Sequence, residues 1–433
     1  MTTKPESVAG GRQAGFSLVE LLLTLVVTMI LFYGVLTTLD FNGRVTRVQT
    51  NVADMQQSLR IAQQEMVRVI RMAGRGTLPA ADAVSAPVPT GVAVSLRNNV
   101  AANQFLIAGD LATAIVEGTD VVTVRGVMSS PVYQIDITSQ NDQNSTGDFV
   151  LTPLLDPNPT GGTLIIRAIS PKGAPQDLAP IREAITNNVP EALVLASSLD
   201  DTFYIVVELL PAASTVNADS ISVGFRLRGT TRADQYRALS RNGTLPTGFH
   251  SVAYAGILEE YAYYVRADRA IDTDNTSALT PKLSRARLFP GTGEAYVSAD
   301  NARVDVADNI LDLQASLGFD TTFSGSTADD ADDLGNDDQI IETANGANDD
   351  WLFNGTSDDP TNGAWRTNPP PNLYYLRVST LARTDRRDSG YQAPLLPDRI
   401  EDRAFTSASP LNSRSERMYR RRLLQTVIDF RNL

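Results

Sequence analysis

The sequence contains no cysteine and only one histidine, His250. Without cysteine, the chain has no disulfide, no thiolate zinc site and no cysteine nucleophile, so its stability depends on packing. A single histidine argues against a histidine-based catalytic triad and against a metal site built from several histidines. Since the sequence also offers no recognisable nucleophile–base pair, we predict that the protein is not an enzyme.

The composition is that of a folded, acidic protein. Of its 433 residues, 42% are hydrophobic and 20% are charged, which are globular values rather than those of a disordered chain. The length suggests one large or two medium-sized globular units. The net charge of −13 disfavours non-specific nucleic-acid binding by the whole molecule but leaves a local basic patch open.

One long hydrophobic run begins near the N-terminus, at Phe16, and continues to about Leu36. A run of about 20 apolar residues is long enough to cross a bilayer as a helix. The run is interrupted by a single charge, Glu20. A carboxylate costs roughly 2.5–3.5 kcal/mol at the centre of a membrane, so we expect Glu20 to have a partner.

The residues around Glu20 resemble the class III signal of type IV pilins and pseudopilins, preceded by a leader that contains Lys4 and Arg12. The segment reads Gly15-Phe16-Ser17-Leu18-Val19-Glu20-Leu21-Leu22. The resemblance implies that a prepilin peptidase removes residues 1–15 by cutting between Gly15 and Phe16 on the cytoplasmic side, and then methylates the amine of Phe16. It also implies that Glu20 pairs with the N-terminal amine of a neighbouring subunit.

Three other interpretations of this segment are weaker. A cleaved secretory signal has a shorter apolar region, followed rather than preceded by the small residue at the cut. A plain membrane anchor with a chance glutamate and an intramembrane ion or proton site are the other two. Basic residues flank the run on both sides, Lys4 and Arg12 before it and Arg44 and Arg47 after it, so the cytoplasmic N-terminus is implied by the resemblance and not by charge.

The helix is expected to continue beyond a transmembrane segment at 16–39. Apolar residues recur every three or four positions, which indicates one apolar face of a helix. They are Val45, Val48, Val52, Met55, Leu59, Ala62, Met66, Val69 and Ala73. Gly74 and Gly76 then supply a stop, so we predict a helix over about 16–73 and assign 16–76 to this element. Gly34 and residues 40–43 are candidate soft points, and the stripe packs either on the chain's own sheet, which we favour, or in a coiled coil.

The remainder of the chain is predicted to be mainly strands, which we divide into a first part, 77–255, and a second part, 256–433. Residues 77–103 are interpreted as a loop that leads to a first strand. Strand-like patterns occur at 120–125, 132–137, 163–169, 202–209, 221–227, 258–266 and 282–289, with a short helix at 177–187. The strand at 282–289 is expected to pair with the strand at 258–266.

Several motifs in the second part resemble the PilW family of minor pilins. These motifs are Tyr263-Tyr264-Val265, the basic strand 282–289, the segment 309–314 (Asn-Ile-Leu-Asp-Leu-Gln) and the C-terminal segment 419–432. The resemblance implies an α+β, pilin-like fold, with the long helix packed on an enlarged antiparallel β-rich head. J-type minor pseudopilins of type II secretion systems share this layout but are usually much shorter.

Residues 320–360 form the most acidic stretch, and we treat them as an acidic loop. Clustered carboxylates suit Ca²⁺, which takes about six to eight oxygen ligands. The candidate ligands are Asp330, Asp332, Asp337 and Asp338. An EF-hand pattern starting at Asp330 fails because its twelfth position is Ile341. A solvated acidic loop is the simpler interpretation, so Ca²⁺ is a candidate ligand and no other cofactor is expected.

The C-terminal region mixes many arginines with carboxylates. Arg420, Arg421 and Arg422 open a predicted strand, and alternation along a strand divides their side chains between its two faces. A salt-bridged surface is the interpretation that we favour. Contact with DNA is the alternative, with the arginines on phosphates and with Tyr391 and Tyr419 stacking on bases.

Together, these features predict a minor pilin, a structural subunit that helps to prime assembly of a type IV pilus and lies at its tip. Its expected partners are the prepilin peptidase, other major and minor pilins contacted through the N-terminal helix, and the assembly platform of the inner membrane. We expect a single-pass inner-membrane protein with a periplasmic head, which then joins the pilus. A tip adhesin or DNA-uptake subunit, and a J-type secretion pseudopilin, are the alternatives.

Overall fold

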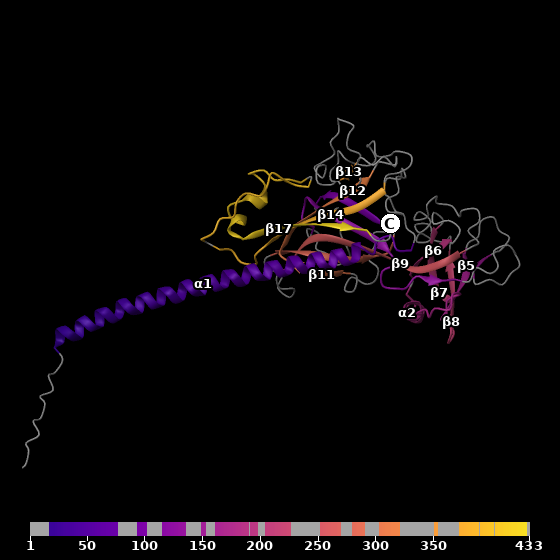
Figure 1. Ribbon diagram of the computed structural model, residues 1–433, viewed down its shortest axis with the longest axis horizontal. Helices are drawn as coiled ribbons and strands as arrows, with labels where there is room; N and C mark the ends of the chain where they lie inside the picture. The colour runs from indigo at the N-terminus through magenta and orange to yellow at the C-terminus, as the bar shows by residue number, and fades with distance from the viewer. Residues whose placement is uncertain are drawn as a thin grey trace, which may run out of the picture. The chain divides into compact units, whose positions relative to one another are not determined.

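A computed structural model describes residues 17–76, 93–101, 115–135, 149–152, 161–189, 191–197, 204–226, 252–269, 279–290, 303–320, 350–353, 372–388, 390–401 and 403–430 (Figure 1). The chain divides into two compact units, Met1–Asp54 and Met55–Leu433. The first unit contains most of one long helix, and the second contains the end of that helix and all of the described strands.

The helix α1 spans Leu18–Ile70 without a break, which confirms the predicted long helix. Neither Gly34 nor residues 40–43 interrupt it, so the expected soft points do not appear as kinks. The hydroxyls of Thr24, Thr28, Thr37 and Thr38 donate to the carbonyl oxygen four residues earlier, at 2.7–2.9 Å. These bonds satisfy the polar side chains within the helix itself, which suits an apolar surrounding. Among the described residues, α1 is the one helix long and apolar enough to span a membrane.

The second half of α1 buries its apolar stripe in the head. The buried residues are Met55, Leu59, Ala62, Met66, Val69, Ile70 and Ala73, at spacings of mostly three and four. This confirms that the stripe packs on the chain's own head from Met55 onwards. The helix ends in a turn over 71–76, where Gly74 and Gly76 have positive φ of 75° and 104°. The Gly74 N–H then donates to the Arg125 carbonyl at 3.0 Å, which joins the turn to the sheet.

The larger sheet has 11 strands and is organised around one of them, β9 (Val252–Arg269). The other strands are β1 (Val94–Val100), β2 (Thr119–Gly126), β3 (Tyr133–Gln134), β4 (Phe149–Thr152), β5 (Gly161–Arg167), β6 (Ala192–Ser197), β7 (Tyr204–Val216), β8 (Ser220–Arg226), β10 (Leu279–Leu288) and β11 (Arg303–Asp308). The first half of β9 pairs with β3 and β6, and its second half pairs with β2 and β10. All of these pairings are antiparallel, as predicted for the head.

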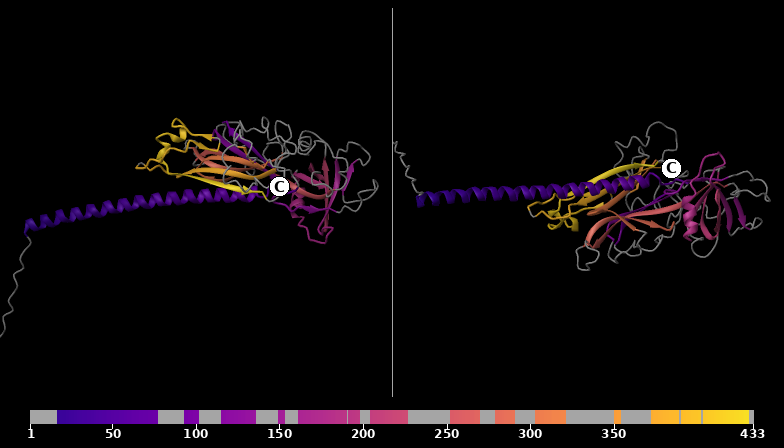
Figure 2. Two further views of the ribbon diagram at one scale, coloured as in Figure 1. Left: turned by 45° about the horizontal axis from the view of Figure 1, so that its top comes forward. Right: turned by 90° about the horizontal axis from the view of Figure 1, so that it is seen from below.

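A smaller sheet of four strands has the order β13-β12-β14-β17. Its strands are β12 (Ile310–Asp320), β13 (Asp350–Phe353), β14 (Asn372–Arg383) and β17 (Arg421–Asp429). A connection between β14 and β17 contains the hairpin β15 (Arg399–Ile400) and β16 (Arg403–Ala404) and the short helical turns η2 (Pro410–Asn412) and η3 (Glu416–Met418). The yellow β17 and the orange β14 lie side by side in both views of Figure 2.

Hydrophobic clusters among the described residues stabilise the head. One is formed mainly by β5 to β9 and by the short helix α2 (Ala179–Thr186), and it contains residues such as Leu164, Ile181, Ile205 and Phe225. A second cluster links β1, β2, β9 and β10 through residues such as Val121, Tyr264 and Ala286. The third packs the connection before β17 onto the smaller sheet, with Leu311 and Leu381 against Ile400 and Phe405.

Most of the predicted strands exist, and 282–289 pairs with 258–266 as expected. Several details of the prediction were wrong. The strand β1 lies inside 77–103, which we had interpreted as a loop. Of the strand expected at 132–137, Tyr133–Gln134 form β3, and residues 136–137 lie outside the described residues. The boundary at 255/256 falls inside β9, so it does not separate two parts of the head. The expected acidic loop 320–360 contains a strand, β13, although residues 321–349 lie outside the described residues.

Candidate functional site: the N-terminal segment and the arginine-rich connection

Ser17 begins α1 by capping its first turn. Its hydroxyl oxygen accepts a hydrogen bond from the Glu20 N–H at 3.2 Å, and its carbonyl oxygen accepts from Glu20 and Leu21 at 3.0 and 3.1 Å. Serine followed three residues later by glutamate is the capping-box pattern. A carboxylate in the first turn also interacts favourably with the positive end of the helix dipole. Glu20 therefore helps to start the helix, a role that the sequence analysis did not assign to it.

The side chain of Glu20 is exposed on α1. Within the described part of the chain, its carboxylate has no hydrogen-bond donor or ion-pair partner, whereas Asp40 pairs with Arg44 at 2.8 Å. Gly15 and Phe16, the predicted cleavage and methylation positions, lie outside the described residues. The geometry thus presents an unpaired carboxylate one helical turn after the predicted cleavage position.

The three candidate nucleic-acid contacts, Arg420, Arg421 and Arg422, have different surroundings. The Arg420 guanidinium pairs with Asp388 at 3.0 Å. Arg421 donates to the carbonyl oxygens of Leu411 and Pro394 at 2.6 and 2.8 Å. Arg422 is exposed on β17. Two of the three guanidinium groups are therefore engaged within the head.

The two tyrosines that were proposed to stack on bases are also covered. The Arg383 guanidinium lies 4.2 Å from the ring centre of Tyr419, and Arg420 lies 4.2 Å from that of Tyr391. Arg383 also pairs with Glu416 at 2.6 Å. Cations placed over aromatic faces are attracted by the ring quadrupole, so these contacts stabilise the connection itself. This arrangement is what the favoured salt-bridged surface predicts.

The candidate calcium ligands cannot be placed. Asp330, Asp332, Asp337 and Asp338 lie outside the described residues. In the part of the chain that the structure describes, no group of three or more His, Asp or Glu side chains is arranged to hold a metal ion. The proposal of a calcium site therefore rests on the sequence of the acidic stretch.

Glu401, which the sequence analysis missed, is the centre of a polar cluster of the connection. Its side chain is 1% exposed, and it accepts hydrogen bonds from Ser316 at 2.6 Å, Ser379 at 2.7 Å and Gln425 at 2.8 Å. Arg377 adds a bond from Nη2 at 2.7 Å. Burial acts to raise the pKa of Glu401, but the bonds from Arg377 and the serines outweigh it, so the pKa lies below its ordinary value.

A second buried carboxylate, Asp312, belongs to the motif at 309–314. Asn309 has a positive φ of 60° between β11 and β12, and Asp312 and Gln314 follow it as buried residues of β12. Gln314 donates to Asp312 at 2.9 Å and to the Gly118 carbonyl at 2.9 Å, and Arg403 pairs with Asp312 at 2.6 Å. Burial raises the pKa of Asp312, and the charge of Arg403 opposes that rise. The polar residues of this motif therefore hold the two sheets and the hairpin together.

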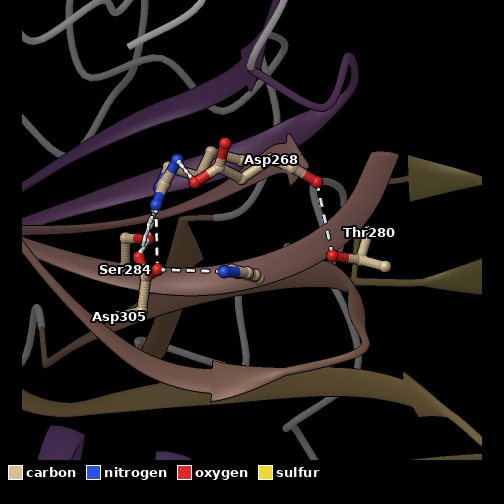
Figure 3. Close-up of polar contacts among 6 residues, drawn as sticks. Asp268, Thr280, Ser284 and Asp305 are labelled. Atoms are coloured by element: carbon tan, nitrogen blue, oxygen red, sulfur yellow. Dashed lines mark hydrogen bonds and ion pairs between the residues drawn. The ribbon is translucent and has the colours of Figure 1, made fainter. Parts of the chain in front are cut away.

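A similar polar cluster joins β9, β10 and β11 (Figure 3). Arg266 pairs with Asp268 at 2.7 Å and with Asp305 at 2.8 Å, and the Ser284 hydroxyl donates to Asp305 at 2.7 Å. Burial acts to raise the pKa of Asp305, but the bonds from Arg266 and Ser284 lower it overall. All of these acidic groups are occupied by fixed partners, which is the arrangement of structural rather than catalytic carboxylates.

The end of α1 carries an open groove of about 720 Å³. Its described lining consists of Gln63, Gln64, Val67, Arg68, Arg71, Met72 and Arg75. That lining offers amides, guanidinium groups and apolar atoms, and it contains no carboxylate, hydroxyl or imidazole that would act as a general base.

Comparison with known proteins supports the N-terminal prediction. A family model described as the prokaryotic N-terminal methylation motif matches residues 10–35. No curated protein and no solved structure matches the chain. The match covers the predicted cleavage position and Glu20, and it supports a type IV pilin-like prepilin signal. The resemblance of the head to PilW stays a prediction.

Proposed function

We propose that this protein is a minor pilin of the PilW type, a structural subunit that helps to prime assembly of a type IV pilus and lies at or near its tip. The observation that carries the proposal is the methylation motif at residues 10–35, followed directly by the helix that is long and apolar enough to span a membrane. The head adds support for a tip position, because a unit that extends from Met55 to Leu433 is bulky for a repeat along a thin filament.

In this mechanism, the prepilin peptidase removes residues 1–15 and leaves the methylated amine of Phe16 next to Ser17, the cap of α1. The unpaired Glu20 carboxylate then accepts the amine of a neighbouring subunit. Pairing removes the cost of an uncompensated carboxylate in an apolar setting, so it favours docking of one helix beside another. The subunit waits in the inner membrane, with its N-terminus cytoplasmic and its head periplasmic, until the assembly platform extracts it.

The first experiment replaces Glu20→Ala in the full chain. We expect normal insertion into the membrane and normal cleavage, but reduced piliation and reduced recovery of the subunit in sheared filaments. Ser17→Ala is the matched control, because it removes the cap and keeps the carboxylate. If Glu20→Ala cells assemble as many pili as the wild type, or if both variants fail equally, the docking role of Glu20 is wrong.

The motif is shared by pili and secretion pseudopili, so a deletion strain distinguishes them. Loss of surface pili supports the minor-pilin proposal, whereas loss of protein secretion with intact pili supports a J-type pseudopilin. For the DNA-uptake alternative, binding of the purified protein to double-stranded DNA is measured at several salt concentrations. Binding that weakens steeply with salt, and that falls on Arg422→Ala, would favour that alternative.

A further inference from the structure

The strand β17 ends the smaller sheet with an open edge. It is nine residues long and pairs with β14 in one continuous register, from Tyr375 opposite Asp429 to Arg383 opposite Arg421. Among the described strands, β14 is its single neighbour. A strand at the edge of a sheet presents unpaired N–H and C=O groups that can extend the sheet with another chain.

Other strand edges in the described head have features that discourage pairing. The β1 strand has a register shift between Arg97 and Val100, with Asn99 at a positive φ of 47°. The β10–β11 pair has a register shift, and β4 and β13 have only four residues each. Such bulges and short edges are the devices by which proteins avoid edge-to-edge association. β17 has neither device, and it exposes Leu423 and Val427 at 40% and 49%.

When two copies of β17 are placed antiparallel, the side chains that face each other are complementary. On the face that contacts Glu401, its residues are Arg421, Leu423, Gln425, Val427 and Asp429. Reversal about Gln425 places Arg421 opposite Asp429 and Leu423 opposite Val427. Asp429 has no ion pair with a described residue, and the described acceptors of Arg421 are two uncharged carbonyl oxygens. Asp429 therefore has no charged partner among the described residues, and the carbonyl oxygens that Arg421 contacts do not neutralise its charge.

We propose that β17 is an interaction surface for a second copy of this chain, with the two β17 strands antiparallel about a twofold axis at Gln425. Opposite charges and apolar pairs directly across two antiparallel strands are stabilising, whereas like charges are not. A twofold contact uses the same patch on both copies, as this self-complementary strand requires. One strand pair buries less surface than a standard interface of about 1,600 Å², so we expect a reversible, concentration-dependent dimer.

The absence of cysteine allows a test of this register by disulfide trapping. In the proposed pair, the new thiol of a Gln425→Cys chain faces its own counterpart, with Cα atoms about 4.5–5.5 Å apart, a separation that a disulfide can bridge. The new thiol of a Leu423→Cys chain lies about 13 Å from its counterpart, because four residues of strand separate them. Mild oxidation of the full chain in detergent should therefore cross-link Gln425→Cys and neither Leu423→Cys nor Val427→Cys alone.

A mixture of Leu423→Cys and Val427→Cys chains should cross-link with each other, since these positions face across the axis.

Sedimentation of the wild-type chain should show a dimer that Val427→Lys weakens by tenfold or more, with the melting temperature unchanged because Val427 is exposed. Asp429→Arg should weaken it similarly through repulsion with Arg421. A wild-type chain that stays monomeric at all concentrations, or Gln425→Cys cross-linking no greater than that of Leu423→Cys, would overturn the proposal. So would cross-linking of the Gln425→Cys chain to a different polypeptide only.

Discussion

At the scale of single residues, the head depends on buried carboxylates whose partners come from distant parts of the chain. Glu401 contacts Ser316, Arg377, Ser379 and Gln425, which lie on three strands of the smaller sheet. It does so from a left-handed backbone conformation, with φ of 52°, that a non-glycine residue seldom adopts. The strain of that conformation is offset by the hydrogen bonds that the carboxylate accepts. Glu401 thus fastens the hairpin β15–β16 to the sheet.

Glu401→Gln is expected to destabilise the protein by about 3 kcal/mol at neutral pH, because it removes the buried carboxylate that forms an ion pair with Arg377. The lowered pKa of Glu401 gives the sign of the pH effect. The ionised Glu401 stabilises the folded state fully above the unfolded-state pKa of about 4.3. This stabilisation is lost as the pH falls through the folded-state pKa of Glu401. Denaturant unfolding at pH 7 and at successively lower pH measures the free energy of unfolding of both proteins. The difference in this free energy between wild type and variant should narrow only below about pH 4.3. A difference that is the same at every pH would contradict this account.

Arg403→Leu is expected to show its pH dependence in a higher pH range. It leaves the buried Asp312 carboxylate uncompensated and should cost about 3–5 kcal/mol at pH 7. The pKa of Asp312 is already raised by burial, and removal of the Arg403 charge raises it further. The folded variant then takes up a proton at a higher pH than the unfolded chain, so its loss of stability should be smaller at pH 5 than at pH 7. Equal losses at both pH values would show that Asp312 is not the group responsible.

At the scale of elements, the helices and strands with a clear pattern in their residue types were predicted from the sequence. Those without such a pattern were missed. The helix α1 was predictable from its apolar stripe, and β9 and β10 from their aromatic and basic residues. The strand β6, Ala192-Leu193-Val194-Leu195-Ala196-Ser197, was missed because it is buried on both faces and its apolar run has no alternation. β1 was missed because Arg97, Asn98 and Asn99 give it the composition of a loop.

Leu59→Ala tests whether the second half of α1 is part of the head core. Leu59 is 1% exposed, so the substitution should cost about 2–5 kcal/mol through lost burial and a residual cavity. Ile61→Ala is the matched control on the same helix, because Ile61 is 46% exposed and should cost less than about 1 kcal/mol. Urea unfolding of the full chain in detergent, followed by the circular dichroism of the strands, measures both values. Similar midpoints for the two variants would mean that the helix end does not stabilise the head.

At the scale of the whole molecule, the N-terminal methylation motif could be recognised from the sequence, whereas the polar clusters of the head could not. The motif from Gly15 to Glu20 is local, so its pattern is complete within six consecutive residues of the sequence. The partners of Glu401 lie 22 to 85 positions away, and Arg403 lies 91 positions from Asp312. No short-range period indicates such contacts, because they depend on strand register, which is set by the packing of the entire head.

The shared strand β9 leads us to expect that the head unfolds as one cooperative unit. Its first half pairs with β6 over the cluster that contains Ile205, and its second half pairs with β2 and β10. If the strands that pair with one half of β9 unfolded, unpaired backbone N–H and C=O groups would be left where the two halves meet, which is costly. Ile205→Ala, at a site that is fully buried, should therefore lower the protection against hydrogen exchange of β2 and β10 amides as much as that of β7 amides. Loss of protection confined to β6, β7 and β8 would show instead that the head contains two units that unfold independently, despite the strand that joins them.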